Sequence, residues 1–293
     1  MENKKMRDRV LVIIVTYNAM RWIKKCIQSI EESTTPLDAL IIDNLSSDNT
    51  VKYVTENYPS IKLIQNMHNL GFGAANNIGL QYAIDNNYDY VYLLNQDAWI
   101  KPNTVSLLIE VHKANAKYGI LSPMQMYANE KVLDNDFKAV YSMASKDSSI
   151  LSVSHVMAAH WLISRECILA VGGFSPSFYH YGEDDNYCDR VRYQGLKIGI
   201  VSTAFAVHDR ENRTYSASQK LYQSYVRTIV YLSGFERTTF FALYGLICDC
   251  IKYLIKERSF LFLKYIKLLT CEFCRIKKNK KDSMEKTAFL HKT

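Results

Sequence analysis

The sequence predicts an α/β fold in which a mostly parallel sheet is flanked by helices and followed by a helical C-terminal region. Four apolar runs in the first hundred residues are typical of buried strands, at 10–15, 40–42, 61–64 and 90–94. A stretch with helical character follows each run, so we expect parallel strands whose carboxyl ends share one edge of the sheet. Ligands of open α/β sheets bind at this edge, and polar residues end each of the four runs.

Helices are expected between these strands, each with a residue suited to its first turn. They cover 19–32 after Asn18, 50–57 after Asp48 or Asn49, and a stretch from Pro102 to about Lys117. Gly71 and Gly73 permit a tight entry into another helix that begins near Ala74. This alternation of strand and helix predicts a first half that spans residues 1–117.

The pattern is less regular after this point. Strands are predicted at 119–123, 156–164, 197–201 and 205–208, with a glycine turn at 172–173 and a helix over 183–194. A polar insertion, 125–155, carries turn signals at 134–136 and 146–149. We expect residues 118–214 to complete one domain, 1–214, and long helices to fill 215–293.

The basic charge is concentrated near the C-terminus. The net charge is +7, and residues 252–281 hold ten Lys and Arg against two acids. The rest of the chain is therefore close to neutral, which disfavours a uniformly basic nucleic-acid-binding protein and favours a local basic surface. We expect no nucleic-acid partner.

The cysteines and the apolar runs indicate a cytoplasmic protein. The run at 10–15 is too short for the core of a signal peptide, and no run has the length expected of a spanning helix. Seven cysteines without a secretion signal are expected as reduced thiols. Cys271 and Cys274 lack a second ligand pair nearby, which argues against zinc.

Two carboxylates follow strands of the first half. Asp97 stands beyond the strand at 90–94, with Asn95 two residues before it, where a divalent cation on a diphosphate would need a ligand. Asp43 could accept a hydrogen bond from a base or a ribose hydroxyl. A structural alternative exists for each, because Asp97 could cap a helix and Asp43 could cap the turn at 46–48.

A glycine motif at 71–76 resembles a dinucleotide fingerprint, but it does not fit that role. Asn76 replaces the third glycine, and the motif follows the third strand instead of the first. The first strand turns through 16–18 without glycine. An NAD-binding domain is therefore disfavoured.

A cluster of acids follows a segment rich in glycine and aromatic residues. Glu183, Asp184 and Asp185 are expected to open a helix at the wall of a cleft. The helix dipole alone would favour them, but mutual repulsion and partial burial could raise one pKa and produce a general base. His208 ends a predicted strand, as either a ligand or a structural histidine.

Taken together, these motifs resemble the inverting family 2 glycosyltransferases of the GT-A fold, especially their rhamnosyltransferase-like branch. The resemblance runs from about residue 10 to residue 208. Its motifs stand in order at 12–18, 42–50, 69–79, 93–97 and 181–185, followed by Asp189 and Arg190. The resemblance implies a nucleotide-binding half at 1–117 and an acceptor half at 118–214.

The resemblance also implies roles for individual residues. Residues expected to bind the nucleotide sugar are Thr16, Asn18, Asp43, Asn69, Gly71, Asn76, Asn95 and Asp97, of which Thr16 and Asp43 contact the base and ribose. Asp97 and His208 would hold Mn²⁺ or Mg²⁺. Asp184 would be the catalytic base, with Glu183 supporting it or meeting the acceptor. Two departures stand out, since Asn95 replaces the first aspartate of a DxD motif and Asn76 stands where many relatives have arginine.

The implied reaction is transfer of a sugar, with inversion, from a nucleoside-diphosphate donor to a glycan or lipid-linked acceptor in cell-surface polysaccharide synthesis. The resemblance suggests L-rhamnose from dTDP, whereas hexose or N-acetylhexosamine from UDP remains open. A nucleotidyltransferase is disfavoured, because residues 16–19 lack a glycine-rich, basic loop. The other alternative is a non-catalytic protein that binds sugar nucleotides or glycans.

The C-terminal helices predict a second surface. Apolar residues from Phe240 to Ile255 share one helical face, and the apolar run 260–263 is followed by the basic residues Lys264 and Lys267 and the segment 275–281. This combination suits an anionic membrane surface, so we expect a cytoplasmic protein peripheral on the inner face of the cell membrane. The alternative is packing on the catalytic domain or on another subunit.

Overall fold

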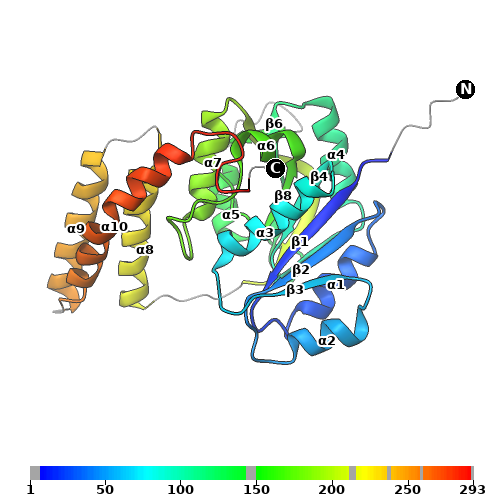
Figure 1. Cartoon of the computed structure of the whole chain (residues 1–293), viewed down its shortest axis with the longest axis horizontal. Helices are drawn as coiled ribbons and strands as arrows, with labels where there is room; N and C mark the ends of the chain where they lie inside the picture. The colour runs from blue at the N-terminus through cyan, green and yellow to red at the C-terminus, as the bar shows by residue number, and fades with distance from the viewer. Residues whose placement is uncertain (1–6, 143–149, 211–215, 236–238, 258–259, 292–293) are drawn as a thin grey trace, which may run out of the picture.

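The structure, a computed structural model, describes residues 7–142, 150–210, 216–235, 239–257 and 260–291 (Figure 1). The expected turn at 146–149 and the expected domain boundary at residue 214 lie outside these described residues. None of the helices in the described ranges combines the length and the apolar character needed to cross a membrane.

The first half of the chain forms the parallel part of the sheet. The strands β1 (Val10–Thr16), β2 (Asp38–Asp43), β3 (Lys62–Gln65) and β4 (Tyr90–Leu94) lie in the order β3-β2-β1-β4, and every neighbouring pair is parallel. The helices α1 (Ile23–Glu31), α2 (Thr50–Asn57) and α3 (Phe72–Asp85) connect them. The predicted alternation and the shared strand edge are therefore confirmed.

The sheet continues through strands of mixed direction. Beyond β4 the order is β8 (His160–Ser164), β6 (Tyr118–Met126), β9 (Lys197–His208) and β5 (Ala98–Ile100), and β7 (Ile150–Val153) also pairs with β9. Of these pairings β6 with β9 is parallel, and β8, β5 and β7 join their neighbours antiparallel. The helices of this half are α4 (Thr104–Ala114), α5 (Asn135–Ser142), α6 (Arg165–Val171) and α7 (Glu183–Tyr193).

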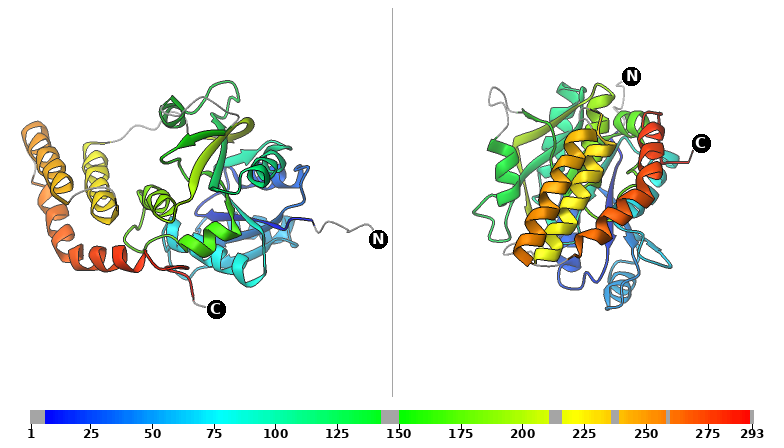
Figure 2. Two further views of the ribbon diagram at one scale, coloured as in Figure 1. Left: turned by 90° about the horizontal axis from the view of Figure 1, so that it is seen from above. Right: turned by 90° about the vertical axis from the view of Figure 1, so that its left-hand side faces the viewer.

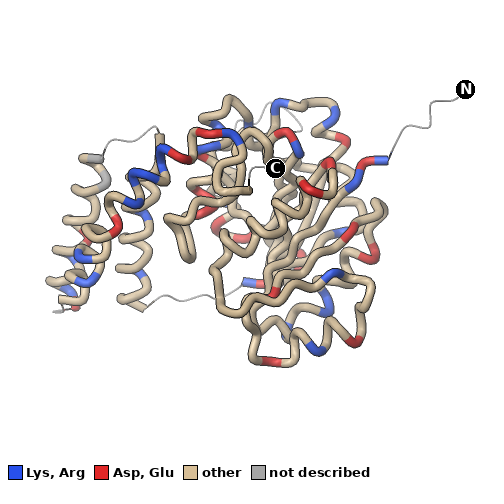
Figure 3. The backbone as a smooth tube through the Cα atoms, viewed as in Figure 1, with Lys and Arg blue, Asp and Glu red and all other residues tan. Residues whose placement is uncertain are grey.

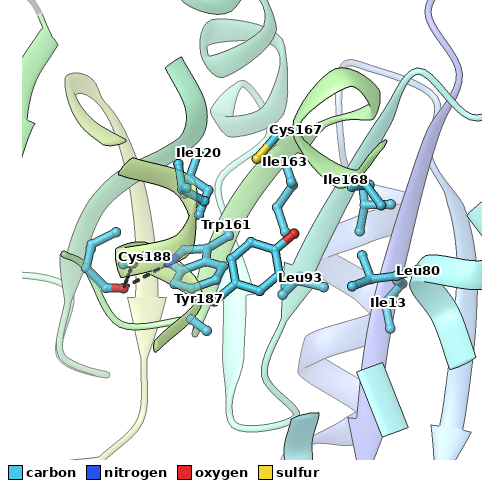
Figure 4. Close-up of a cluster of buried hydrophobic side chains, with 14 of the residues drawn as sticks. Ile13, Leu80, Leu93, Ile120, Trp161, Ile163, Cys167, Ile168, Tyr187 and Cys188 are labelled. Atoms are coloured by element: carbon cyan, nitrogen blue, oxygen red, sulfur yellow. Dashed lines mark hydrogen bonds between the residues drawn. The ribbon is translucent and has the colours of Figure 1, made fainter. Parts of the chain in front are cut away.

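Helices cover both faces of the sheet because successive strand residues point to opposite sides. In β1, Leu11 and Ile13 pack with α3, α6 and α7 on one face, whereas Val12 and Ile14 pack with α1, α2 and α4 on the other. Trp161 of β8 and Tyr187 of α7 meet in the first of these cores, with ring centroids 5.7 Å apart (Figure 4). Strands buried on both faces explain the unbroken apolar runs in the sequence.

The last helices form a separate layer at one end of the molecule (Figure 2). The helix α8 (Ala217–Ser233) packs between α7 and α9 (Thr239–Glu257), and α10 (Phe262–Asp282) runs from this layer back toward α6. Their shared apolar contacts include Ile229 and Leu232 of α8, Leu246 of α9 and Leu269 of α10.

The segment after α10 returns to the helices that cover the sheet. The backbone N–H of Gly173 donates to the Ala288 carbonyl at 2.7 Å, and the N–H of His291 donates to Oε1 of Gln81 in α3 at 2.8 Å. Gly172 has φ +86° here, and a Cβ atom on it would lie 2.1 Å from the Ala288 carbonyl oxygen. Residues 287–291, called the C-terminal clasp below, thus contact both α3 and the end of α6.

Several predicted boundaries in the first half are wrong. The helix expected from residue 19 begins at Ile23, because Asn18 adopts φ 52° and its side chain accepts from the Ser47 and Asp48 N–H groups instead of capping a helix. Pro102 precedes α4, which begins at Thr104. The strand at 90–94 leads into β5 before any helix begins.

The second half also differs from its prediction. The two short strands expected at 197–201 and 205–208 are one strand, β9, with a register shift opposite Pro123 and Met124. The strand expected from residue 156 begins at His160. The insertion at 125–155 contains α5 and β7, whose apolar residues pack on the sheet. Alternation along such short segments was too weak a signal to predict them.

Candidate functional site

A cavity of about 700 Å³ opens where the strand ends meet the first turns of α3 and α7. Val15 and Tyr17 reach it from the end of β1, and residues 157–159 reach it from the segment just before the antiparallel strand β8. Of the residues predicted from the sequence, those that line it are Asn69, Gly71, Asn95, Asp97, Glu183, Asp184 and His208. The sheet thus brings together side chains from distant parts of the chain.

The short strand β5 explains how Asp97 meets His208. Ala98 is paired with His208 in the antiparallel β5–β9 ladder, and the N–H of Asp209 donates to the Asp97 carbonyl at 2.8 Å. As a result, Nε2 of His208 lies 3.4 Å from Oδ1 of Asp97. Both side chains are buried, with exposures of 7% for Asp97 and 3% for His208.

The polar atoms around this pair are not all satisfied by the protein. Within the described residues, neither ring nitrogen of His208 makes a hydrogen bond, and neither does Oδ1 of Asn95. Buried polar atoms usually have partners, so unmet ones at the wall of a cavity indicate a ligand. The described residues contain no group of three or more His, Cys, Asp or Glu side chains that could hold a metal by themselves.

His160 packs behind His208, the partner of Asp97. No pattern in the sequence predicted this residue. Its ring is fully buried, with its centroid 6.5 Å from that of His208. Nε2 of His160 faces the Val207 carbonyl at 3.0 Å and must donate, so Nδ1 accepts from the Tyr92 hydroxyl at 3.0 Å. Burial, with His208 nearby, lowers the pKa of His160 to about 3, so the ring is neutral and fixes the end of β9.

The acidic pair stands at the opposite wall, at the start of α7. Gly182 takes φ +81° before the helix, which turns Glu183 and Asp184 toward the cavity. Glu183 is 7% exposed, and its Oε2 makes no hydrogen bond within the described chain. Burial, followed by the charge of Asp184, raises the pKa of Glu183 to about 8. Asp184 is half-buried, and its Oδ1 accepts from the Asp185 N–H at 2.9 Å.

Asp43 and Thr16 lie at the same sheet edge but do not belong to the described lining of the cavity. The Asp43 carboxylate accepts from the Thr16 hydroxyl at 2.9 Å and from the N–H and hydroxyl of Ser46 at 2.9 and 2.5 Å. It therefore makes the turn contacts that were the structural alternative for this residue. Its contact with a base or ribose, like that of Thr16, stays a prediction.

Asn18 and Asn76 are also absent from the described lining. Asn18 holds the loop at 47–48 through its side-chain oxygen. Asn76 is buried in α3, where its side-chain amide donates to the Phe72 carbonyl at 3.0 Å. A nucleotide-binding role for either residue stays a prediction.

The cavity also contains residues that were not predicted. The Gln96 side chain accepts from the Tyr17 N–H at 2.7 Å and donates to its carbonyl at 3.2 Å, which ties the first loop to the 95–97 segment. Arg210 lines the cavity beside His208 and is held by two hydrogen bonds to the buried carboxylate of Asp134. These pairs connect distant segments, and no local pattern in the sequence marks them.

Aromatic residues at 179–181 form the rim near α3. The Tyr179 hydroxyl donates to the Asn69 carbonyl at 3.3 Å. Gly71 has φ +80°, and a Cβ atom on it would lie 2.1 Å from the Tyr179 carbonyl oxygen. Tyr222 of α8 donates its hydroxyl to the His180 carbonyl at 3.1 Å. A glycine at position 71 therefore allows the backbone of Tyr179 to lie close to the start of α3.

Comparison with known proteins finds glycosyltransferases by sequence profile and by sequence identity. The sequence profile described as Glycosyl transferase family 2 matches residues 11–168. The low-salt glycan biosynthesis hexosyltransferase Agl10 of Haloferax volcanii is 24% identical over 230 residues, 74% of this chain and 73% of that protein. The N-acetylglucosaminyl-diphospho-decaprenol L-rhamnosyltransferase of Mycobacterium tuberculosis is 23% identical over 241 residues, 71% of this chain and 78% of that protein.

A solved structure extends the likeness to the fold. The mannosyltransferase PcManGT from Pyrobaculum calidifontis, in complex with GDP-Man and Mn²⁺, superposes with a TM-score of 0.62 at 16% identity, covering 97% of this chain and 88% of that one. Neighbours of this kind have the GT-A fold, which confirms the predicted fold class. With the profile matched from β1 into α6, over more than half of its length, the chain belongs to glycosyl transferase family 2.

Proposed function

We propose that this glycosyltransferase moves a sugar from a nucleoside-diphosphate donor to a hydroxyl group of a glycan or lipid-linked acceptor, with inversion at the anomeric carbon. The observation that carries the proposal is the single cavity shared by Asn95, Asp97 and His208 on one wall and by Glu183 and Asp184 on the other. The first wall suits a diphosphate, and the second suits the acceptor hydroxyl.

A divalent cation fits the first wall. Asp97 and His208 supply an oxygen and a nitrogen ligand, and the unmet hydrogen-bonding capacity of the His208 ring suits coordination. When bound, Mn²⁺ or Mg²⁺ would offset the negative charge of the departing nucleoside diphosphate. The protein offers few ligands, which leaves room for diphosphate oxygens. The Mn²⁺ in the Pyrobaculum mannosyltransferase structure supports the same choice.

The different surroundings of Glu183 and Asp184 suggest different roles for the two acids. Burial and the charge of Asp184 raise the pKa of Glu183 to about 8, so Glu183 is mostly protonated at neutral pH. The acid with the raised pKa was expected to be the base, but its protonation makes Glu183 the weaker candidate. We assign proton removal to Asp184, which lines the same cavity and is more exposed. Glu183 then serves as a hydrogen-bond donor to the acceptor or to Asp184. As the acceptor oxygen attacks the anomeric carbon, its proton passes to Asp184 and the diphosphate leaves from the opposite face.

For the donor, L-rhamnose from a dTDP sugar and a hexose or N-acetylhexosamine from UDP are the candidates. The name of the Mycobacterium relative supports rhamnose and a polyprenyl-diphosphate-linked acceptor, whereas the Haloferax relative supports a hexose. The exposed aromatic rim at 179–181 suits stacking of a sugar ring. We place the reaction in polysaccharide assembly at the cytoplasmic face of the cell membrane, with residues 1–214 as the catalytic domain and 215–293 as its helical extension.

The test is thermal stabilisation of the full chain by UDP, dTDP, GDP and NAD, each with and without Mn²⁺. We expect one nucleoside diphosphate to raise the melting temperature only when Mn²⁺ is present, and NAD to have no effect. That nucleotide would identify the donor class. Stabilisation without any metal dependence would contradict the roles of Asp97 and His208. A bound donor that is never hydrolysed or transferred would favour a non-catalytic sugar-nucleotide-binding protein.

A further inference from the structure

The helix α9 has two opposite apolar stripes. The inner stripe, which includes Leu246 and Cys250, is buried against α8, where Asp249 also accepts a hydrogen bond from the Ser224 hydroxyl at 2.5 Å. The outer stripe repeats every three or four residues and is between 52% and 74% exposed. Its members are Phe240, Tyr244, Ile247, Ile251 and Ile255. One stripe attaches the helix to the protein, and the other is not needed for that purpose.

Further exposed apolar residues flank the outer stripe along the chain. Phe241 lies beside its first residue and is 67% exposed, and Phe260 and Leu263, near the start of α10, are 65% and 53% exposed. The layer of α8, α9 and α10 stands at the end of the molecule, with α9 on the far side of α8 from the sheet (Figures 1 and 2). A long row of exposed apolar side chains on one helix face is typical of a binding face.

Lysines border this surface. Lys252 and Lys256 follow Ile251 and Ile255 by one position each and are exposed. Lys264 and Lys267 lie in the same way on α10 and are also exposed, within the run of basic residues seen along α10 in Figure 3. Long lysine side chains beside an apolar stripe reach anionic headgroups while the stripe enters the apolar boundary below them.

We propose that the outer stripe of α9 and its bordering lysines, together called the α9 face, bind the surface of an anionic lipid bilayer. The inference deepens the proposed function, since it rests on a lipid-linked acceptor for its purpose. Charge favours a lipid bilayer over a second copy of the chain as the binding partner of this face. Two copies would bring lysine-bordered stripes against each other, whereas anionic lipid headgroups attract the lysines. The helix α8 joins this face to the cavity, to which it contributes Gln219.

The experiment is flotation of the full chain with vesicles of phosphatidylcholine and phosphatidylglycerol in equal parts, and with phosphatidylcholine alone. We expect binding to the mixed vesicles that weakens as salt is raised, and at least about tenfold weaker binding to neutral vesicles. The variant Ile247→Asp with Ile251→Asp tests the stripe, and Lys252→Glu with Lys256→Glu tests the charge. Each pair should weaken binding to the mixed vesicles by about tenfold or more.

The controls place a single aspartate or glutamate at exposed positions away from the α9 face. Val132→Asp and Lys52→Glu should bind vesicles as the unchanged chain does. Light scattering without lipid measures self-association. A chain that dimerises through the α9 face, loses dimerisation in the Ile247→Asp, Ile251→Asp variant and ignores vesicles would overturn the proposal in favour of a subunit interface. Equal binding by the variants and the unchanged chain would overturn it as well.

Failure of the membrane proposal and failure of the proposed function are separable. Nucleotide stabilisation and transfer to a water-soluble acceptor report on the cavity, and flotation without any nucleotide reports on the α9 face. If the α9 variants lose vesicle binding, keep nucleotide stabilisation and lose transfer only to a lipid-linked acceptor, both proposals hold. Vesicle binding without any nucleotide response would leave the membrane proposal standing and refute the transferase chemistry.

Discussion

Two polar clusters lie at the same edge of the sheet and differ in how their hydrogen bonds are used. At the ends of β1 and β2, the Asp43 carboxylate receives hydrogen bonds from Ser46, in the turn after β2, and from Thr16, at the end of the neighbouring strand β1. At the ends of β4 and β9, the His208 ring makes no hydrogen bond with the described residues although it is buried beside Asp97.

The difference separates a cluster that holds the fold from one that is prepared for a ligand. A carboxylate satisfied by its own loop stabilises the protein without any ligand, whereas buried unmet groups cost stability until a ligand meets them. Stability and function should therefore respond in opposite ways to substitutions at the two clusters. The same reasoning applies to Glu183 and Asp184 on the far wall.

The largest effect is expected at the acidic wall. Asp184→Asn should reduce the turnover number by about 100-fold to 10,000-fold, because it removes the group that accepts the proton. Donor affinity, measured by nucleotide titration, should stay within a few-fold of the unchanged chain. Asp185→Asn is the control, since it makes the same change on the same helical turn outside the described cavity lining. Loss of donor binding in Asp184→Asn would sink the base assignment.

A pair of variants tests the two strand-end clusters directly. Asp43→Asn should lower the free energy of unfolding by about 1–3 kcal/mol, because an amide group cannot accept all the hydrogen bonds that the buried carboxylate accepts. His208→Gln should change it less, yet should raise the Mn²⁺ concentration needed for nucleotide stabilisation by at least about tenfold. Urea denaturation and metal titration of both variants provide the comparison. Equal losses of stability in the two would remove the distinction between the clusters.

A further effect is a change in pH dependence at Glu183. The folded protein keeps this proton up to about pH 8, whereas the unfolded chain releases it near its usual pKa of 4.5. Stability from this group is therefore present at low pH and is lost as pH rises across that window. Glu183→Gln should remove this loss, so its stability relative to the unchanged chain should increase with pH. Urea denaturation across the window, with the exposed Glu56→Gln as control, measures it, and parallel curves would contradict the raised pKa.

The sequence predicted the elements that have a regular apolar pattern or a local motif. Long apolar runs predicted β1 and β4, and the acids after Gly182 predicted the start of α7. It could not predict β5, because three residues give no periodicity, and β5 is the element that brings Asp97 to His208. The supporting roles of His160 and Gln96 depend on partners far along the chain, so no local signal marked them.

Asp43 shows a different limit, since spacing leaves two roles open for it. A carboxylate at a strand end fits a nucleotide site and a turn equally well from spacing alone, and Ser46 three residues later was the local clue to the turn. The acceptor atoms that are left for a ligand are those that the protein's own hydrogen bonds do not use. Only the folded chain determines which atoms these are. Asn18 is similar, because its left-handed conformation redirects its side chain to the neighbouring loop.

The C-terminal clasp has a consequence for the order of folding. Its contact between His291 and Gln81 joins positions 210 residues apart, and the Phe289 ring lies 5.0 Å from the guanidinium carbon of the buried Arg190. Contacts of such long range form slowly, because the loop between them must close first. During synthesis, a chain that has completed its sheet still exposes the surface that Leu290 will cover. The part of the chain that contains the sheet therefore reaches its final state only after the helical layer has been made, and the exposed surface favours aggregation during that interval.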